Sequence, residues 1–182
     1  MLIEELPIQA CLDLLSRVRS GRLACAQQCQ PYVVPFYFHY HYECLYSFST
    51  VGQKIEWMRA NPKVCVEADE VKSAHQWTSV VAYGRYEELL DTAEWRSERE
   101  RAWKLLRQHA MWWEPGYVKT IVHGTERSLA AVFYRIHLDR VTGRHATLER
   151  AVPADTGLPA IEVVEGGRLQ RILRLVQGRL RQ

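Results

Sequence analysis

A run of hydroxyl residues, glycine and lysine between Leu45 and Lys54 gives the clearest chemical signal in the sequence. It reads LYSFSTVGQK and leads into a helix-like segment that stops at Pro62. Hydroxyls and backbone amides at a helix start donate hydrogen bonds, the helix dipole favours an anion there, and a lysine adds a positive charge. We therefore predict an anion site, suited to a phosphate. On the residues alone, simple capping of the helix by Ser49 or Thr50 is an equal alternative.

Other patterns that could bind a metal or act as nucleophiles are weaker. His39 and His41 share one face of a predicted strand, because side chains alternate along a strand. No carboxylate or cysteine follows at ligand spacing, which favours a partly exposed strand face over a metal pair. Cys25 and Cys29 also lack a second Cys or His pair. We predict no metal site, and the catalytic residues stay unknown.

The elements that position the Leu45–Lys54 run are mostly strands. Six strands are predicted, over residues 22–27, 31–40, 45–49, 63–71, 77–87 and 129–140. Three helices are predicted, over residues 6–20, 53–60 and about 91–109. Pro31 and Pro35 imply an edge or a bulge in their strand. Asp91 and Glu94 predict a capping box for the last helix, and Thr142-Gly143 predicts the end of the last strand. Closely spaced strands with few helices indicate an antiparallel barrel with helices outside.

Eight short motifs occur in a specific order along residues 21–147. They are GRLA (21–24), PYVVP (31–35), LY (45–46), GQK (52–54), RANP (59–62), VCVE (64–67), SVVAYG (79–84) and YRIHLDRVTG (134–143). Together they resemble the pyridoxamine 5′-phosphate oxidase-like FMN-binding split-barrel family, particularly its nitroimidazole-resistance-type branch. The resemblance implies a mostly β fold, a six-stranded antiparallel split β-barrel with flanking helices. It also implies a homodimer with FMN in two clefts at the subunit interface.

The same resemblance implies a set of cofactor-binding residues. They are Val33, Val34, Pro35, Phe36, Ser47, Phe48, Ser49, Thr50, Gln53, Lys54, Trp77 and Ser79. By this likeness residues 31–36 lie along the isoalloxazine ring, Gln53 and Lys54 hold the phosphate, and Trp77 with Ser79 closes the site. Gln53 stands where the oxidase members have an arginine, so one charged bidentate contact is lost. The oxidase's basic pyridoxal-phosphate motifs have no counterpart here, which argues against oxidation of pyridoxamine phosphate.

A flavin at this site implies an oxidoreductase that acts on a small electron acceptor, with NAD(P)H as the electron donor. The flavin supplies the redox chemistry, so no catalytic side chain is required. Two alternatives stay open. Related barrels that resemble this one hold haem or the deazaflavin F420, and a non-catalytic flavin-binding module would need no substrate at all.

The loop around Trp112 and Trp113 also contains Pro115 and Gly116. Two tryptophans in such a loop could cover the flavin and form a substrate pocket for small molecules. Anchoring of the loop on the barrel, or burial in the dimer interface, is an equal alternative.

Length and charge predict one split-barrel domain, residues 1–150, followed by an extension over 151–182 that contains a linker, a strand and a basic amphipathic helix. Five arginines and no acidic residue occur from Arg168 to Gln182, and the rest of the chain has 19 basic and 21 acidic residues. We therefore expect no nucleic-acid partner. The apolar stripe of the predicted helix lacks aromatic anchors, which favours packing onto the barrel or the partner subunit over membrane binding.

Five cysteines, an odd number within predicted strands and helices, favour a reducing compartment. No apolar run reaches the roughly 18–20 residues that a membrane span needs. The first twenty residues contain acidic side chains at intervals, unlike a secretory or transit segment. A cytoplasmic location is the expectation.

Overall fold

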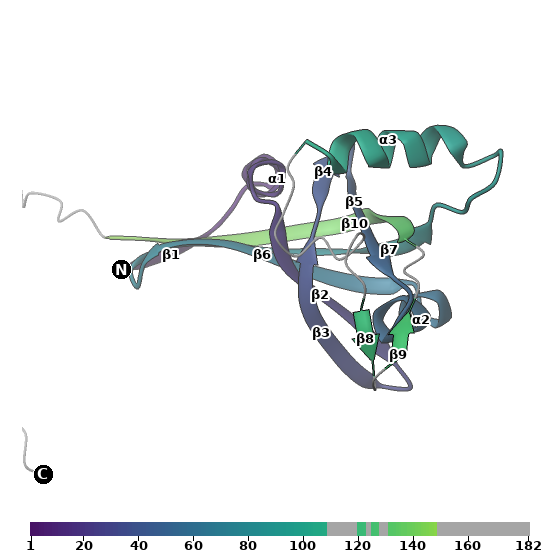
Figure 1. Ribbon diagram of the computed structural model, residues 1–182. Helices are drawn as coiled ribbons and strands as arrows, with labels where there is room; N and C mark the ends of the chain where they lie inside the picture. Colours follow the sequence, from purple (N-terminus) through teal and green to yellow (C-terminus); the bar gives the residue numbers. More distant parts are fainter. Residues whose placement is uncertain (109–119, 123–124, 128–130, 149–182) are drawn as a thin grey trace, which may run out of the picture. The chain divides into compact units, whose positions relative to one another are not determined.

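The computed structural model describes residues 1–108, 120–122, 125–127 and 131–148 (Figure 1). The helices are α1 (Ile8–Arg17), α2 (Gln53–Ala60) and α3 (Arg96–Leu106). The strands are β1 (Leu2–Glu5), β2 (Ser20–Gln27), β3 (Gln30–Tyr37), β4 (His39–His41), β5 (Cys44–Thr50), β6 (Lys63–Ser73), β7 (Gln76–Glu88), β8 (Thr120–Val122), β9 (Thr125–Arg127) and β10 (Ala131–Thr147). The predicted extension 151–182 and the loop with Trp112 and Trp113 lie outside the described residues.

The main sheet is antiparallel and follows the order β3-β2-β6-β7-β10-β5-β4, with β1 beside β10. Its two edges, β3 and β4, are consecutive in sequence and separated only by Phe38. The sheet must therefore curl until these edges approach each other. The Ser47 hydroxyl of β5 also joins this end of the sheet to β3, because it donates to the Tyr37 carbonyl oxygen at 2.7 Å. The predicted mostly β, antiparallel split barrel with flanking helices is confirmed.

Two clusters of buried side chains hold the barrel and its helices together. The larger one fills the barrel, and Tyr134, Leu23, Leu45, Ile55 and Val66 are among its fully buried members. The smaller one lies between the outer face of β5 and α3, and its buried members are Tyr37, Cys44, Tyr46, Leu89, Ala102 and Leu106. The other two helices pack elsewhere, α1 on β10, β4 and β7, and α2 on β2.

Two strand predictions differ from the structure. The predicted strand 31–40 is interrupted at Phe38, which belongs to neither strand, although its amide still donates to the Arg19 carbonyl at 2.9 Å in register with the β2–β3 ladder. This break separates β4 from β3. The last strand does not end at Thr142-Gly143 but runs on to Thr147. Gly143 is needed there for close packing, because a Cβ atom would lie 2.7 Å from the Cys11 sulfur on α1.

The predicted capping box before α3 is wrong. The helix begins at Arg96 after Trp95, and no side chain caps it. Asp91 forms an ion pair with Arg99 at 3.5 Å, and the same guanidinium donates to the Leu89 carbonyl at 2.8 Å. Residues 91–95 therefore fold into turns before the helix starts. The strand β1 was not predicted, since its four residues show no clear alternation.

A bend in the sheet separates the two halves of β10. The ladder between β7 and β10 changes register between Leu138 and Arg140, which marks a β-bulge. Gly84 lies opposite this point, and a Cβ atom there would lie only 2.2 Å from the His137 carbonyl oxygen. Bulges and glycines of this kind allow a strand pair to turn a barrel corner.

Candidate flavin-binding site

The start of α2 combines four of the predicted site residues. Ser49 and Thr50 end β5, and Gln53 and Lys54 open α2 after an extended Gly52. No side chain caps the first turn of α2. Its leading amide groups therefore remain available to an anion, at the end of the helix where the dipole is positive. The structure does not support the alternative in which Ser49 or Thr50 caps this helix.

Lys54 is partly buried at this corner. Burial lowers the pKa of its ammonium group, an effect that the nearby Cys25 thiol partly offsets. Within the residues that the structure describes, no carboxylate forms an ion pair with Lys54. A buried cation without a counter-ion is unfavourable unless a ligand supplies the negative charge. The corner therefore fits a phosphate.

An ion pair fixes α2 on the barrel. The Arg59 guanidinium donates two hydrogen bonds of 2.7 Å to the Glu88 carboxylate on β7, which also accepts one from the Tyr86 hydroxyl at 2.9 Å. At the end of the helix, the Asn61 amide donates to the Ala26 carbonyl at 2.9 Å. These bonds hold the last turn of α2 on the barrel, and through this short helix they limit the movement of Lys54 in its first turn.

Replacing Glu88 with glutamine is expected to reduce the free energy of unfolding by about 1 kcal/mol at pH 7, a modest value because Arg59 is partly exposed. The bonds from Arg59 lower the pKa of Glu88, and the Tyr86 hydroxyl adds to this against the effect of burial. A lowered folded-state pKa stabilises the protein above the usual carboxyl range, and the stabilisation is lost as the pH falls through the folded pKa. Denaturant unfolding should therefore show the two proteins converging in acid.

The exposed pair Arg17–Glu70 offers a matched control for this measurement. Glu70→Gln should change the free energy of unfolding by only about 0.3 kcal/mol, since both side chains are solvated. Equal losses in the two variants, or a Glu88→Gln deficit that persists at pH 2, would contradict the role given to Glu88.

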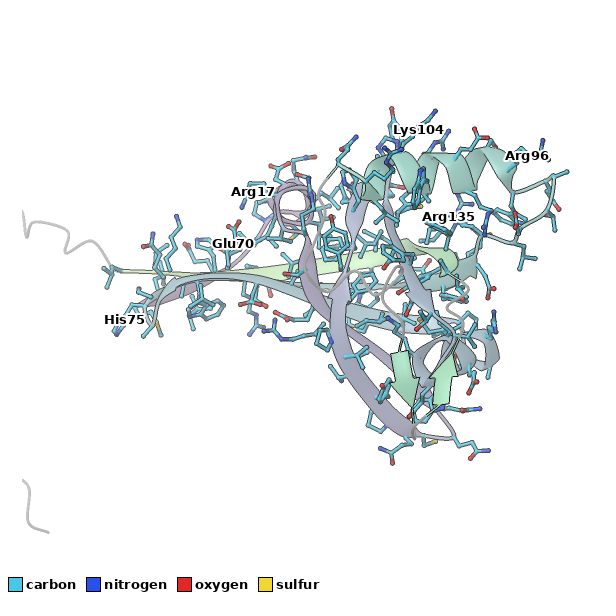
Figure 2. All side chains as sticks on the ribbon, viewed as in Figure 1. Arg17, Glu70, His75, Arg96, Lys104 and Arg135 are labelled. Atoms are coloured by element: carbon cyan, nitrogen blue, oxygen red, sulfur yellow. The ribbon has the colours of Figure 1, made fainter. Side chains whose placement is uncertain are left out.

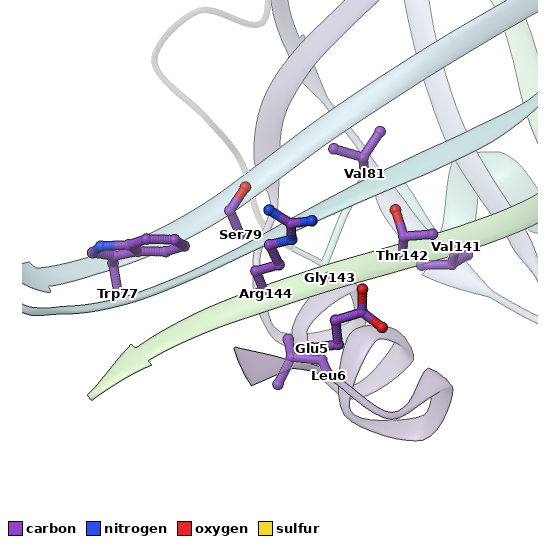
Figure 3. Close-up of a pocket in the computed structure, with 9 residues that line it drawn as sticks. All are labelled: Glu5, Leu6, Trp77, Ser79, Val81, Val141, Thr142, Gly143 and Arg144. Carbon is purple, nitrogen blue, oxygen red and sulfur yellow. The ribbon is translucent and has the colours of Figure 1, made fainter. Parts of the chain in front are cut away.

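Trp77 and Ser79 lie in a different part of the molecule. They line a pocket of about 610 Å³ between β7, β10 and the segment that joins β1 to α1 (Figure 3). The other lining residues are Glu5, Leu6, Val81, Val141, Thr142, Gly143 and Arg144. The Ser79 hydroxyl donates to Glu67 at 3.0 Å. An indole, a guanidinium and hydroxyl groups around one hollow can accept a flat polar ring.

The sheet register separates this pocket from the start of α2. Thr50 pairs with Ala131 at one end of β10, whereas Ser79 pairs with Arg144 near the other end. The strand path from Ala131 to Arg144 is about 40 Å at the usual rise per residue. In Figure 1, the β1 end of β10 lies at the left and α2 at the right. One protomer therefore does not bring the predicted phosphate residues and the predicted closing residues together.

The predicted ring-facing residues on β3 alternate between two faces. Val33 and Pro35 point outward, while Val34 is partly buried and Phe36 is packed in the barrel core. Among the described strands, β3 pairs only with β2, so it is an edge, as its two prolines predict. Its outer backbone edge has no strand partner there and is open to a ligand.

Ser47 and Phe48 point to opposite faces of β5. Ser47 is buried, and its hydroxyl is bonded to the Tyr37 carbonyl. Phe48 lies on the α3 side and contacts the ring of Phe133, with centroids 5.9 Å apart. Their side chains cannot line one common surface, and the contribution of Ser47 to a ligand would be through its backbone.

Sequence reasoning missed a polar network on the α3 side of the sheet, formed by Cys44, His137, Glu87 and Arg135. These residues come from three strands far apart in the sequence, and no local motif connects them. No group of three His, Cys, Asp or Glu side chains in the described part of the chain is arranged to hold a metal ion. No helix among the described residues is long and apolar enough to span a membrane.

Comparison with known proteins identifies the family. Residues 7–145 match the family model described as pyridoxamine 5′-phosphate oxidase. The chain belongs to the pyridoxamine 5′-phosphate oxidase family. An uncharacterized family relative from Rhizobium meliloti (strain 1021) is 40% identical over 146 residues, which cover 80% of this chain and 97% of the relative.

Solved structures agree with this family assignment. The crystal structure of an FAD-binding protein from Mesorhizobium loti is 46% identical and has a TM-score of 0.68, over 81% of this chain and 100% of that chain. A protein from Bacteroides thetaiotaomicron named for 5-nitroimidazole antibiotic resistance is 18% identical, with a TM-score of 0.56 over 80% of this chain and 89% of that chain. The second likeness shows the shared split-barrel fold of the family.

Proposed function

We propose that this protein binds FMN and works as a flavin-dependent oxidoreductase on a small electron acceptor, with NAD(P)H as the donor. The observation that supports this best is the partly buried Lys54 ammonium, which has no ion pair among the described residues and lies beside the uncapped start of α2. The 46% identical relative is described as an FAD-binding protein, which favours a flavin over haem or F420 for this chain. FMN and FAD share the phosphate on the ribityl chain, so the same corner suits both.

In this proposal the phosphate is held by the leading amides of α2, the Lys54 ammonium and the hydroxyls of Ser49 and Thr50. Gln53 is exposed and adds a neutral donor. The isoalloxazine ring lies along the open edge of β3. Bound flavin supplies hydride and electron transfer. The chain positions the ring and offers its backbone groups to it, which needs no nucleophilic side chain.

We further propose that the site is shared by two copies of this chain. Trp77, Ser79 and Arg144 lie at the far end of β10 from Lys54, so they can complete a flavin site only for another protomer. In a homodimer, the pocket of each subunit would face the α2 corner of its partner. The dimer would then have two equivalent flavin sites. Such an arrangement makes use of all the predicted residues that one protomer keeps apart.

The identity of the released cofactor tests the cofactor assignment. The purified protein is denatured, and the supernatant is separated by liquid chromatography against FMN, FAD and F420 standards, after an absorption spectrum of the native protein. We expect yellow protein that releases FMN. Release of FAD would keep the phosphate site but replace the cofactor, whereas a Soret band or an F420 peak would overturn the flavin proposal.

A second experiment tests whether the bound flavin is used in catalysis. Anaerobic addition of NADH or NADPH should bleach the flavin within the dead time of manual mixing, and no bleaching would favour a non-catalytic module.

A further inference from the structure

A thiol, an imidazole and a carboxylate form a hydrogen-bonded series on three adjacent strands, away from the proposed flavin site. The Cys44 sulfur on β5 lies 3.3 Å from Nδ1 of His137 on β10, its direct cross-strand partner. The other ring nitrogen, Nε2, lies 2.9 Å from the Glu87 carboxylate on β7. A nucleophile, a base and a group that orients the base are arranged in this order in many enzymes with an activated thiol or hydroxyl.

The Glu87 carboxylate sets the hydrogen-bonding roles of the two ring nitrogens of His137. Burial alone would raise the pKa of Glu87, but the bonds from His137 and Arg135 outweigh it and hold that pKa below its usual range. Glu87 is therefore ionised at neutral pH, and its carboxylate accepts a hydrogen bond from the Nε2–H group. Nδ1 is then left as the acceptor that faces the Cys44 thiol.

Arg135 and Glu98 fix the carboxylate from the other side. The Arg135 guanidinium contacts Glu87 at 2.5 Å and Glu98 of α3 at 3.1 Å. The Tyr46 hydroxyl also donates to Glu98, at 3.1 Å. Figure 2 shows Arg135 between the sheet and α3. The whole series is thus held by bonds from the sheet and from α3, so its geometry does not depend on one flexible side chain.

The thiol lies just behind the surface. Cys44 is 5% exposed, while the His137 side chain is 41% exposed. Burial raises the pKa of the Cys44 thiol, although Arg135 partly offsets this. At rest the sulfur is therefore protonated, and it becomes a good nucleophile only if a base accepts its proton during the reaction. His137 is the base within reach.

We propose that Cys44 is an oxidisable thiol that reacts with hydrogen peroxide, with His137 as the base and Glu87 as the residue that positions it. The sulfur attacks one peroxide oxygen, so an S–O bond forms while the O–O bond breaks. The thiol proton moves to Nδ1 of His137 and then to the departing hydroxide, which leaves as water. Sulfur loses two electrons to the peroxide, and the product is a sulfenic acid.

The other cysteines provide comparisons within the same chain. Cys11 and Cys25 are buried, Cys65 is partly buried and Cys29 is exposed. None of them forms a hydrogen bond with a histidine among the described residues. Burial without a base predicts slow oxidation for Cys11 and Cys25. A fast reaction at Cys44 would therefore reflect its neighbours and not its exposure.

Oxidation at Cys44 would also disturb the contact with α3. The thiol belongs to the buried cluster that contains Ala102 and Leu106 of that helix. A sulfenic oxygen there needs hydrogen bonds that these apolar side chains cannot provide. We expect the cluster to loosen, so that the thermal unfolding midpoint falls after peroxide treatment of the wild-type protein but not of a Cys44→Ser variant.

The test follows all five thiols in the native full-length protein. The protein is treated with limiting hydrogen peroxide, which is then removed with catalase, and it is unfolded in guanidinium with dimedone so that every sulfenic acid is labelled. Mass spectrometry of the digest gives one rate per cysteine. We expect Cys44 to react at least tenfold faster than Cys11 and Cys25. His137→Gln should slow Cys44 at least tenfold and leave Cys29 unchanged.

Glu87→Gln provides the second variant. It keeps an acceptor for Nε2 but removes the charge that stabilises a protonated imidazole, so the Cys44 rate should fall by a smaller factor than in His137→Gln. Melting curves establish that each variant is folded. The proposal is overturned if Cys44 reacts no faster than Cys11 and Cys25, or if the folded His137→Gln and Glu87→Gln variants react at the wild-type rate.

Discussion

Lys54→Met is expected to weaken FMN binding by about 10- to 100-fold, the equivalent of one lost charge-assisted contact of about 1.5–3 kcal/mol. Methionine keeps the apolar stem of the side chain and removes only the ammonium group. The affinity is measured by titrating the apoprotein with FMN and following the quenching of flavin fluorescence. The same variant should leave the free energy of unfolding of the apoprotein unchanged or raised, because the ammonium is partly buried and no described residue supplies a counter-ion.

Lys63→Met is the matched control, since Lys63 is exposed at the start of β6 and lies outside the proposed contacts. It removes the same charge from the protein but should change the affinity less than twofold. If the two variants bind FMN equally well, the phosphate does not lie at Lys54. If Lys54→Met instead destabilises the apoprotein, the residue has a structural role.

Mixed dimers of two defective chains are expected to regain one flavin site per dimer. Lys54→Met removes the phosphate contact and Trp77→Ala removes the indole of the pocket, so each homodimer should lose most of its flavin. When the chains are co-expressed with different tags and the heterodimer is isolated, one site has both defects and the other has neither. Flavin content per dimer, from absorbance and protein concentration, should be half that of the wild-type protein.

The doubly substituted chain paired with a wild-type chain is the control for this experiment. In the shared-site arrangement each of its two sites has one defect, so it should hold little flavin. In an arrangement where each site belongs to a single chain, the outcomes are reversed: the double-mutant heterodimer would retain one intact site, and the mixed dimer would retain none. A monomer in solution would rule out the shared site directly.

Much of the fold can be predicted from local patterns. Each of the six predicted strands has a counterpart in the structure, because these segments are rich in the β-branched and aromatic residues that fit a pleated, half-buried surface. The helix at 53–60 also matches, since Pro62 and its polar start limit it on both sides. The motif at Ser49–Lys54 could be predicted because its members are neighbours in the chain.

Features that depend on strand pairing could not be predicted. The direction of Ser47 follows from the register between β5 and β10, where it lies opposite Tyr134 in the core. The contact of Cys44 with His137 joins residues 93 positions apart. The separation of Trp77 from Lys54 likewise follows from the length of β10. Sequence motifs gave the members of the proposed site but not their division between the two ends of the sheet.

The central place of β10 has a consequence for how the protein is made. This strand pairs with β1, β5 and β7. Among the described strands β1 has no other partner, and β5 and β7 each keep one edge unpaired until residues 131–147 have left the ribosome. Until then the nascent chain holds β5 and β7 with unpaired backbone edges, which can join other chains. Stable folding therefore waits for almost the whole barrel sequence, and a chain that terminates before Ala131 should be a target for chaperones and proteases instead of a smaller folded barrel.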